Sequence, residues 1–484
     1  MIQARRAALA LAVALALFLV VRAIQAHRSA PLALWHMFAP HEMSAKELER
    51  ADWRAYLAAE DRLFDEVRRN VTEKLAPEDQ VPANRYFAGA PIYPGRFAHD
   101  WNRSYELAPD GPPRGVVVLL HGLTDSPYSL RHVGRAYRER GFFVVAPRLP
   151  AHGTTPGALA SVRWEDWMAA TRLAVREARA KAPAPAPLEI VGFSNGGALA
   201  LKYALDAIED ETLARPDRLV LISPMVGITR FARFAGLAGL PALLPAFAGA
   251  AWLGVVPEFN PFKYNSFPVN GARQSYEVTQ ALQTRLETLA RAGKLKALPP
   301  ILTFQSVVDF TVSTRAIIVS LYALLPPDGG HELTLFDVNR NAAFGQMLRL
   351  AADTALNRLL PPPPRNFAVS VLTNASPGVD QIVERRTPAG SLAEDERPLA
   401  LAFPPGVFSL SHVALPFPLS DSLYGLDPDA SENFGAHLGA ITPRGERGAL
   451  IVSLDSLLRM SSNPFFPYML ARIVDGAGQT EKTP

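Results

Sequence analysis

Short apolar runs alternate with helix-like segments from about Arg114 onward, and this alternation limits the possible folds more than any other feature. The runs are GVVVLL, FFVVAPRL, LEIVGF, RLVLIS, ILTFQSVV and ELTLFDV. Strands of a parallel sheet are predominantly apolar in this way when helices cover both faces of the sheet. The pattern therefore predicts an α/β protein with a mostly parallel central sheet.

The sequence GFSNG, residues 192–196, lies directly between a predicted strand and a predicted helix. A turn this tight puts the serine in strained dihedral angles, and Gly192 and Gly196 avoid clashes with neighbouring backbone. The turn raises Ser194 above the carboxyl end of the sheet, at a helix N-terminus whose dipole favours developing negative charge. The five residues recur by chance elsewhere, but between a strand and a helix they predict a nucleophilic serine.

A serine hydroxyl is a weak nucleophile and needs a base, an orienting carboxylate and an oxyanion hole. The backbone N–H of Asn195 can supply one oxyanion donor. The loop HGLTDSPYS after the first strand can supply a second from Leu123, because Gly122 allows close approach of the backbone. His121 precedes the nucleophile in the chain, so we interpret it as a structural histidine.

The acid and the base are expected after the later strands. Asp309 follows the run ILTFQSVV and is the predicted acid, although an Asp at a strand end is also a common turn former. Asp337, after the next strand, is the alternative. His412, in a loop bounded by proline, is the predicted base, and His437 is the alternative. His331 precedes the last strand and is predicted to lie at the surface.

The chain order Ser194, Asp309, His412 is that of the α/β-hydrolase fold, and the sequence resembles that superfamily from about residue 115 to 337 and again around His412. The segments LLHGLTDSPYSLR, APRLPAHGTTPG, SVRWEDW and IVGFSNGGALAL are similar to those of bacterial carboxylesterases and monoacylglycerol-lipase-like serine hydrolases. The resemblance implies that Ser194 is the nucleophile and that Leu123 and Asn195 form the oxyanion hole. The sequence departs from the family in the long gap before His412. Its N-terminal segment and the residues after Pro418 have no counterpart in the family.

Changes in composition divide the chain further. We expect a signal anchor or signal peptide at 1–26, a helical connecting region at 27–113, hydrolase core at 114–226 and 299–340, an apolar cap insertion at 227–298, a second insertion at 341–408, and a C-terminal region at 409–484 that carries the catalytic histidine. The cap is unusually apolar, which favours an acyl pocket, with a surface resting on a bilayer as an added role and simple packing on the core as the alternative. The stretch NPFKYNSFP, residues 260–268, is expected to close the cap over the cleft, and the sequence assigns it no chemistry.

Arg5 and Arg6 precede an uncharged run at residues 7–21. We expect an uncleaved signal anchor with these arginines on the cytoplasmic side of the bacterial inner membrane and the catalytic domain on the periplasmic side. A signal peptide cleaved after Ala26, giving a secreted or periplasmic protein, is the alternative, although Ile24 stands where a small residue is preferred.

Composition argues against several other classes of protein. The formal net charge is only +3 and the basic residues are scattered, so we expect no nucleic-acid partner. The absence of cysteine removes thiol nucleophiles, disulfides and thiolate metal sites. The ten histidines lack metal-ligand spacing and no G-x-G-x-x-G follows a strand, so we expect neither a metal nor a cofactor.

The predicted function is hydrolysis of small-molecule carboxylic esters, including lipidic esters. Acyl transfer, thioester hydrolysis and amide or peptide hydrolysis on the same triad are alternatives within that chemistry. A non-catalytic binding module of the same fold is an alternative of another class. A binding module would be expected to lose part of the set, whereas Ser194, Asp309, His412 and Gly122 are all present.

Overall fold

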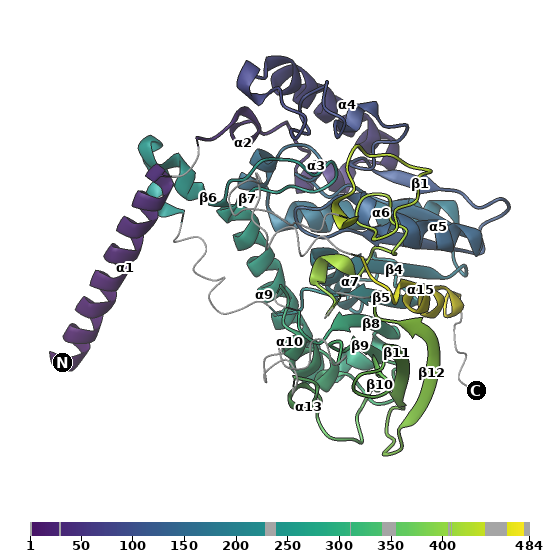
Figure 1. The fold of residues 1–484 in the computed structure, drawn as a ribbon. Helices are drawn as coiled ribbons and strands as arrows, with labels where there is room; N and C mark the ends of the chain where they lie inside the picture. The colour runs from purple at the N-terminus through teal and green to yellow at the C-terminus, as the bar shows by residue number, and fades with distance from the viewer. Residues whose placement is uncertain are drawn as a thin grey trace.

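One continuous β-sheet forms the frame of the molecule (Figure 1). The computed structural model describes residues 2–28, 31–227, 239–309, 311–340, 355–404, 407, 409–440 and 462–478. Within these residues, ten strands pair in the order β1-β3-β2-β4-β5-β8-β9-β10-β11-β12. Strands β3 to β10 in this order run parallel, whereas β1, β11 and β12 are antiparallel to their neighbours.

Six of these strands, β2, β3, β4, β5, β8 and β9, lie where the apolar runs predicted them, whereas β1, β10, β11 and β12 were not predicted. Their bounds are β1 (Tyr105–Leu107), β2 (Gly115–Leu120), β3 (Phe142–Ala146), β4 (Leu188–Phe193), β5 (Arg218–Ile222), β8 (Ile301–Ser306), β9 (Glu332–Phe336), β10 (Ala368–Asn374), β11 (Gln381–Thr387) and β12 (Asp395–Ala402). Every residue of β2 and β4 is buried, as expected for central parallel strands covered on both faces. The predicted mostly parallel sheet is confirmed.

Helices cover both faces of the sheet (Figure 1). The sheet therefore separates two hydrophobic cores, one on each face. Successive side chains of a strand point to opposite faces, so Val116 and Val118 of β2 enter one core and Val117 and Leu119 the other. The first core contains α6 (Trp164–Lys181), α7 (Asn195–Asp206), α9 (Val269–Arg291) and α10 (Thr314–Ser320). The second contains α5 (Arg131–Glu139) and α15 (Phe466–Asp475).

Two segments expected to be insertions contribute to this frame. Residues 341–408 supply β10, β11 and β12, which extend the central sheet; β10 pairs in parallel with β9, and all its residues are buried. In the region 227–298, α9 packs against α6 and α7 and so belongs to the helical layer. The rest of its described part comprises η7 (Leu240–Leu243), η8 (Pro245–Ala251) and the hairpin of β6 (Trp252–Gly254) and β7 (Phe267–Pro268); residues 228–238 lie outside the described residues.

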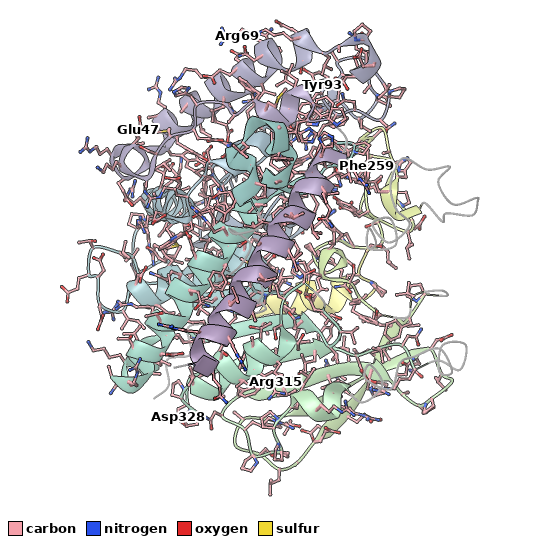
Figure 2. All side chains as sticks on the ribbon, turned by 90° about the vertical axis from the view of Figure 1, so that its left-hand side faces the viewer. Glu47, Arg69, Tyr93, Phe259, Arg315 and Asp328 are labelled. Carbon is pink, nitrogen blue, oxygen red and sulfur yellow. The ribbon has the colours of Figure 1, made fainter. Side chains whose placement is uncertain are left out.

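The N-terminal region begins with the helix α1 (Ile2–Arg28), which contacts η8 and extends away from the body of the molecule (Figure 1). Figure 2 views the molecule from the side on which α1 lies. Three further helices follow: α2 (Leu34–Met37), α3 (Ala45–Arg50) and α4 (Trp53–Asn70). In the part of the chain that the structure describes, no helix is both long enough and apolar enough to cross a bilayer, so the expected membrane segment is not supported. The periplasmic location stays a prediction.

Candidate active site

Ser194 occupies the turn between β4 and α7 in a strained backbone conformation. Its φ is 55° and its ψ is −114°, a region that residues other than glycine rarely adopt. A Cβ at Gly196 would overlap the carbonyl oxygen of Leu120, and one at Gly192 would overlap the carbonyl oxygen of Gly196. The Ser194 N–H donates to the carbonyl oxygen of Ile222 at 2.9 Å, which ties the turn to β5. Sheet, helix and glycines thus hold Ser194 in one position.

The loop after β8 places Asp309 against His412. Asp309 Oδ2 and His412 Nδ1 are 2.8 Å apart, and the Asp309 side chain is fully buried. Asp309 Oδ1 accepts hydrogen bonds from the N–H groups of Thr311 (2.7 Å) and Val312 (3.0 Å), and Gln305 Nε2 donates to Oδ2 at 3.2 Å. Burial on its own would raise the pKa of Asp309, but the charge of His412 and these hydrogen bonds hold it below its ordinary value. The carboxylate is therefore ionised at neutral pH.

His412 begins the short helix η11 (His412–Ala414) and is 5% exposed. Its ring stacks on Phe193, the last residue of β4, with centroids 5.3 Å apart and planes at 27°. The Ser306 hydroxyl donates to the carbonyl oxygen of Leu410 at 2.8 Å and ties the histidine loop to the end of β8. Because Nδ1 faces Asp309, Nε2 is the nitrogen that remains for proton transfer.

The two alternative residues lie elsewhere. Asp337 pairs with Arg340, with Nε and Oδ2 3.0 Å apart, and accepts a hydrogen bond from Thr373 Oγ1 at 2.9 Å. His437 Nδ1 lies 3.2 Å from the carbonyl oxygen of Ser422. Of the histidines and acids weighed from the sequence, the structure brings together Asp309 and His412.

His121 determines the orientation of the loop that carries Gly122 and Leu123. The Leu149 N–H donates to His121 Nε2 at 3.0 Å, so the proton lies on Nδ1 and is donated to the Gly122 carbonyl oxygen at 2.9 Å. Burial, above all, holds the pKa of His121 well below its ordinary value and keeps the ring neutral. The C=O and N–H of one trans peptide point in opposite directions, so this bond turns the Leu123 N–H away from His121. Sequence reasoning identified a structural histidine but not this role.

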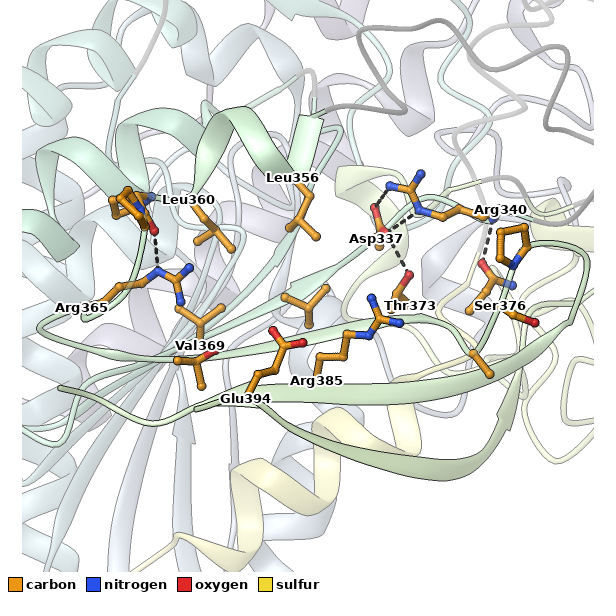
Figure 3. A pocket seen from close by; sticks show the side chains of 17 residues that line it. Asp337, Arg340, Leu356, Leu360, Arg365, Val369, Thr373, Ser376, Arg385 and Glu394 are labelled. Atoms are coloured by element: carbon orange, nitrogen blue, oxygen red, sulfur yellow. Dashed lines mark hydrogen bonds and ion pairs between the residues drawn. The ribbon is translucent and has the colours of Figure 1, made fainter. Parts of the chain in front are cut away.

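Ser194 and His412 open into one pocket of about 380 Å³. Its apolar lining consists of Leu123, Phe193, Met225, Val256, Phe259, Phe267 and Val413, and its polar lining includes Thr124, Asn260, Lys263, Asn265, Thr311 and Tyr424. A larger hollow of about 760 Å³ lies against β10 and β11 and contains Asp337 and Arg340 (Figure 3). It contains neither Ser194 nor His412, so its size does not make it the centre of the chemistry.

Among the described residues, no three or more histidine, cysteine, aspartate or glutamate side chains are placed to hold a metal ion. The pocket contains the Ser194 hydroxyl and the imidazole of His412, which Asp309 supports, and backbone N–H groups lie nearby. Such a set can move a proton from a hydroxyl and stabilise a negatively charged oxygen.

Part of the chain is similar to known hydrolases and esterases. The model of the family described as serine aminopeptidase, S33, matches residues 111–256. The thermostable monoacylglycerol lipase of Bacillus sp. (strain H-257) is 32% identical over 88 residues, which are 18% of this chain and 34% of the lipase. A carboxylesterase of Bacillus subtilis (strain 168) is 40% identical over 52 residues, 11% of this chain and 21% of the esterase. The matched part of the chain thus spans about a third of the length of the lipase and about a fifth of the length of the carboxylesterase.

Solved structures of similar fold are more distant. One reported for LipS and LipT, two metagenome-derived lipolytic enzymes, has a TM-score of 0.38 at 22% identity and covers 49% of this chain and 86% of its own. The monoacylglycerol lipase of Paleococcus ferrophilus has a TM-score of 0.34 at 17% identity and covers 48% of this chain and 87% of its own.

Proposed function

We propose that this chain, an α/β-hydrolase, cleaves carboxylic esters with Ser194 as the nucleophile, His412 as the base and Asp309 as the orienting acid. The observation that carries the proposal is the 2.8 Å contact between Asp309 and His412 beside the pocket that contains Ser194. Three loops from distant parts of the chain meet there, and each supplies the group that acyl transfer to serine requires.

In the first step, His412 Nε2 accepts the hydroxyl proton as Ser194 Oγ attacks the ester carbonyl carbon. The ionised Asp309 holds the imidazole by its Nδ1–H and stabilises the imidazolium that forms. The N–H groups of Leu123 and Asn195 are assigned to the oxyanion, and loss of one such donor costs roughly 3 kcal/mol. The C–O bond then breaks, and the alcohol leaves with the proton from His412.

In the second step, water replaces the alcohol. His412 accepts a proton from water as the water oxygen attacks the acyl-enzyme, and the carboxylic acid leaves when Ser194 Oγ takes that proton back. An alcohol entering in place of water would give acyl transfer on the same residues. An amide or a thioester entering in place of the ester would require no other groups, so these activities stay predictions for the same site.

The pocket lining supports an ester whose acyl group is apolar. Val256, Phe259 and Phe267 form an apolar wall, and Met225 and Val413 add to it. The names of the two relatives, a monoacylglycerol lipase and a carboxylesterase, are consistent with such a substrate. We therefore propose small acyl esters, including lipidic ones, as the substrate class.

Labelling with a fluorophosphonate probe tests this proposal. We expect the wild-type protein to be labelled and the Ser194→Ala and His412→Ala variants not to be. His437→Ala is the matched control and should be labelled like the wild type, because His437 faces Ser422. A panel of ester, thioester and anilide substrates then identifies the bond that is cleaved. A folded wild-type protein without labelling would reject the proposal, and loss of labelling in His437→Ala alone would overturn the choice of base.

A further inference from the structure

One loop provides much of the wall of the Ser194 pocket. We call residues 255–266, which connect β6 to β7, the pocket loop. It contributes Val256, Phe259, Asn260, Lys263, Tyr264 and Asn265 to the lining. Phe259 is labelled in Figure 2. Only two residues at each end of the loop region pair as strand, so contacts from other parts of the chain must fix its backbone.

The region 27–113, which we call the N-terminal segment, supplies several of these contacts, beside those that core residues such as Thr124 make with the loop. The Arg85 N–H donates to the carbonyl oxygen of Glu258 at 2.9 Å, and Arg85 Nη1 donates to that of Asn260 at 3.3 Å. Asn102 Nδ2 donates to the carbonyl oxygen of Pro261 at 3.0 Å. Arg85 Nη2 also donates to Asn102 Oδ1 at 2.9 Å, which joins the two supports. Both side chains are buried, so water does not compete for these bonds.

A second support joins α2 to the end of the pocket loop through His36 and Ser266. The Ala33 N–H donates to His36 Nδ1 at 3.0 Å, so His36 Nε2 carries the proton and donates to Ser266 Oγ at 3.0 Å. Ser266 Oγ donates to the Val256 carbonyl oxygen at 2.9 Å and accepts from the Val256 N–H at 3.1 Å. Ser266 thus clamps the two ends of the pocket loop together, and His36 holds the clamp.

Further contacts from the N-terminal part of the chain hold the hairpin of β6 and β7 in position. The His36 ring meets Trp252 of β6 edge-on, with centroids 4.9 Å apart and planes at 81°. Arg22 Nη2, from α1, donates to the carbonyl oxygens of Ala250 (3.2 Å) and Trp252 (3.0 Å). The pocket wall is therefore held from outside by residues that precede the hydrolase core in the chain.

We propose that the N-terminal segment sets the substrate selectivity of the enzyme, with His36, Arg85 and Asn102 as positioning residues that fix the shape of the pocket loop. This inference rests on the proposed function and goes beyond it, because these residues precede residue 111, where the match to the family begins. An apolar wall favours one acyl group over another only while its backbone is held in place. Loss of a support should lower kcat/KM for esters whose acyl groups are long enough to reach Val256, Phe259 and Phe267. It should have little effect on an acetate ester.

The test compares p-nitrophenyl esters of increasing acyl length on the full chain. We expect His36→Ala and Ser266→Ala each to lower kcat/KM for the best long-chain ester by about tenfold, as for a lost methylene contact, and the acetate value by less than about threefold. Because both variants break one clamp, the double variant should be no worse than either single one. Asn102→Ala, which breaks the other support, should also lower the ratio of kcat/KM for the long-chain ester to kcat/KM for the acetate ester. His41→Ala, an exposed histidine of the same segment, is the matched control and should leave the ratio unchanged.

Each result decides the proposal. A long-chain to acetate ratio within about twofold of wild type in His36→Ala, Ser266→Ala and Asn102→Ala would overturn it. So would an equal loss on all esters accompanied by a lower Tm, which would show that the contacts only stabilise the fold. A wild-type protein that is neither labelled by fluorophosphonate nor active on the acetate ester would reject the proposed function, and the inference with it. Labelling together with an unchanged ratio would reject the inference alone.

Discussion

Asp309 Oδ2 and His412 Nδ1 lie 2.8 Å apart although 103 positions separate the two residues in the chain. Between them the chain completes β9, adds β10, β11 and β12 to the sheet, and only then returns to the carboxyl end of β8. The return is secured by the bond from Ser306 Oγ to the carbonyl oxygen of Leu410. The long separation of the proposed acid and base in the sequence therefore reflects the strands added between them.

Asp309→Asn should lower kcat by about 10⁴ with little change in KM, because an amide cannot hold the imidazole in the tautomer that accepts the Ser194 proton. Steady-state kinetics with an acetate ester, together with a Tm measurement, checks this expectation. Asp337→Asn is the matched control, since Asp337 pairs with Arg340. If Asp337→Asn removed activity in a folded protein while Asp309→Asn retained it, the assignment of the acid would be wrong.

His121→Phe should reduce kcat by about tenfold to a hundredfold and leave KM nearly unchanged. The Gly122 carbonyl loses its hydrogen bond, and the Leu123 N–H is then less firmly directed at the oxyanion, although the donor itself remains. The same substitution at His99, an exposed histidine, is the control and should not alter kcat. A change confined to KM would contradict a role in the transition state.

Local patterns in the sequence were sufficient to predict the parallel centre of the sheet and the turn that carries Ser194. The apolar runs predicted β2, β3, β4, β5, β8 and β9, and the glycines around Ser194 predicted a tight turn from residues that lie next to each other in the chain. The same patterns did not reveal β10, because its residues follow the proline-rich stretch 361–364 and lack the long apolar run of the other strands. Continuation of the sheet depends on an edge being open beside β9, which is a property of the whole fold.

Contacts between distant segments were beyond sequence reasoning. The supports that Arg85 and Asn102 give to the pocket loop join an N-terminal region to the cap, and neither residue stands in a recognisable motif. The prediction that His331 lies at the surface was wrong: the residue is 2% exposed. The start of β10 lies beside it, since the Ala368 N–H donates to the His331 carbonyl oxygen at 3.0 Å, and the pattern of β9 does not show which segment lies against its end.

Asp421→Asn should lower the free energy of unfolding by about 3 kcal/mol, because the buried Arg131 would keep only Glu432, at 3.4 Å, as a charged partner. Both side chains are fully buried, with Arg131 Nη1 and Asp421 Oδ2 2.7 Å apart. Urea denaturation measures the change. Asp429→Asn, at an exposed position, is the control and should change the free energy by less than about 1 kcal/mol.

The contribution of Asp421 should also depend on pH. Burial alone would raise the pKa of Asp421, but Arg131 and the hydrogen bond from His132 hold it below its ordinary value. The stabilisation is therefore present above the pKa of the unfolded state, about 4, and is lost as the pH falls further. If the difference between wild type and Asp421→Asn stayed constant down to about pH 3, the ion pair would not be its source.

His331→Phe should make the stability of the protein less sensitive to acid. Burial lowers the pKa of His331 to about 4, whereas the unfolded chain has an ordinary histidine. Between these values the unfolded state binds more protons, so His331 makes the free energy of unfolding fall by up to about 1.4 kcal/mol for each pH unit of acidification. Above about pH 6.5 the variant should be as stable as the wild type within about 1 kcal/mol, because neither ring nitrogen has a hydrogen-bond partner among the described residues.

Urea denaturation of the wild type and of His331→Phe between about pH 7.5 and 4.5 measures this difference in slope. His41→Phe controls for loss of a histidine at an exposed position and should not change the slope. Parallel curves for wild type and His331→Phe would mean that His331 takes up its proton as readily in the folded state as in the unfolded state. The buried ring would then need an acceptor or a water molecule beside it, and the cavity of about 800 Å³ that it lines is large enough to hold one.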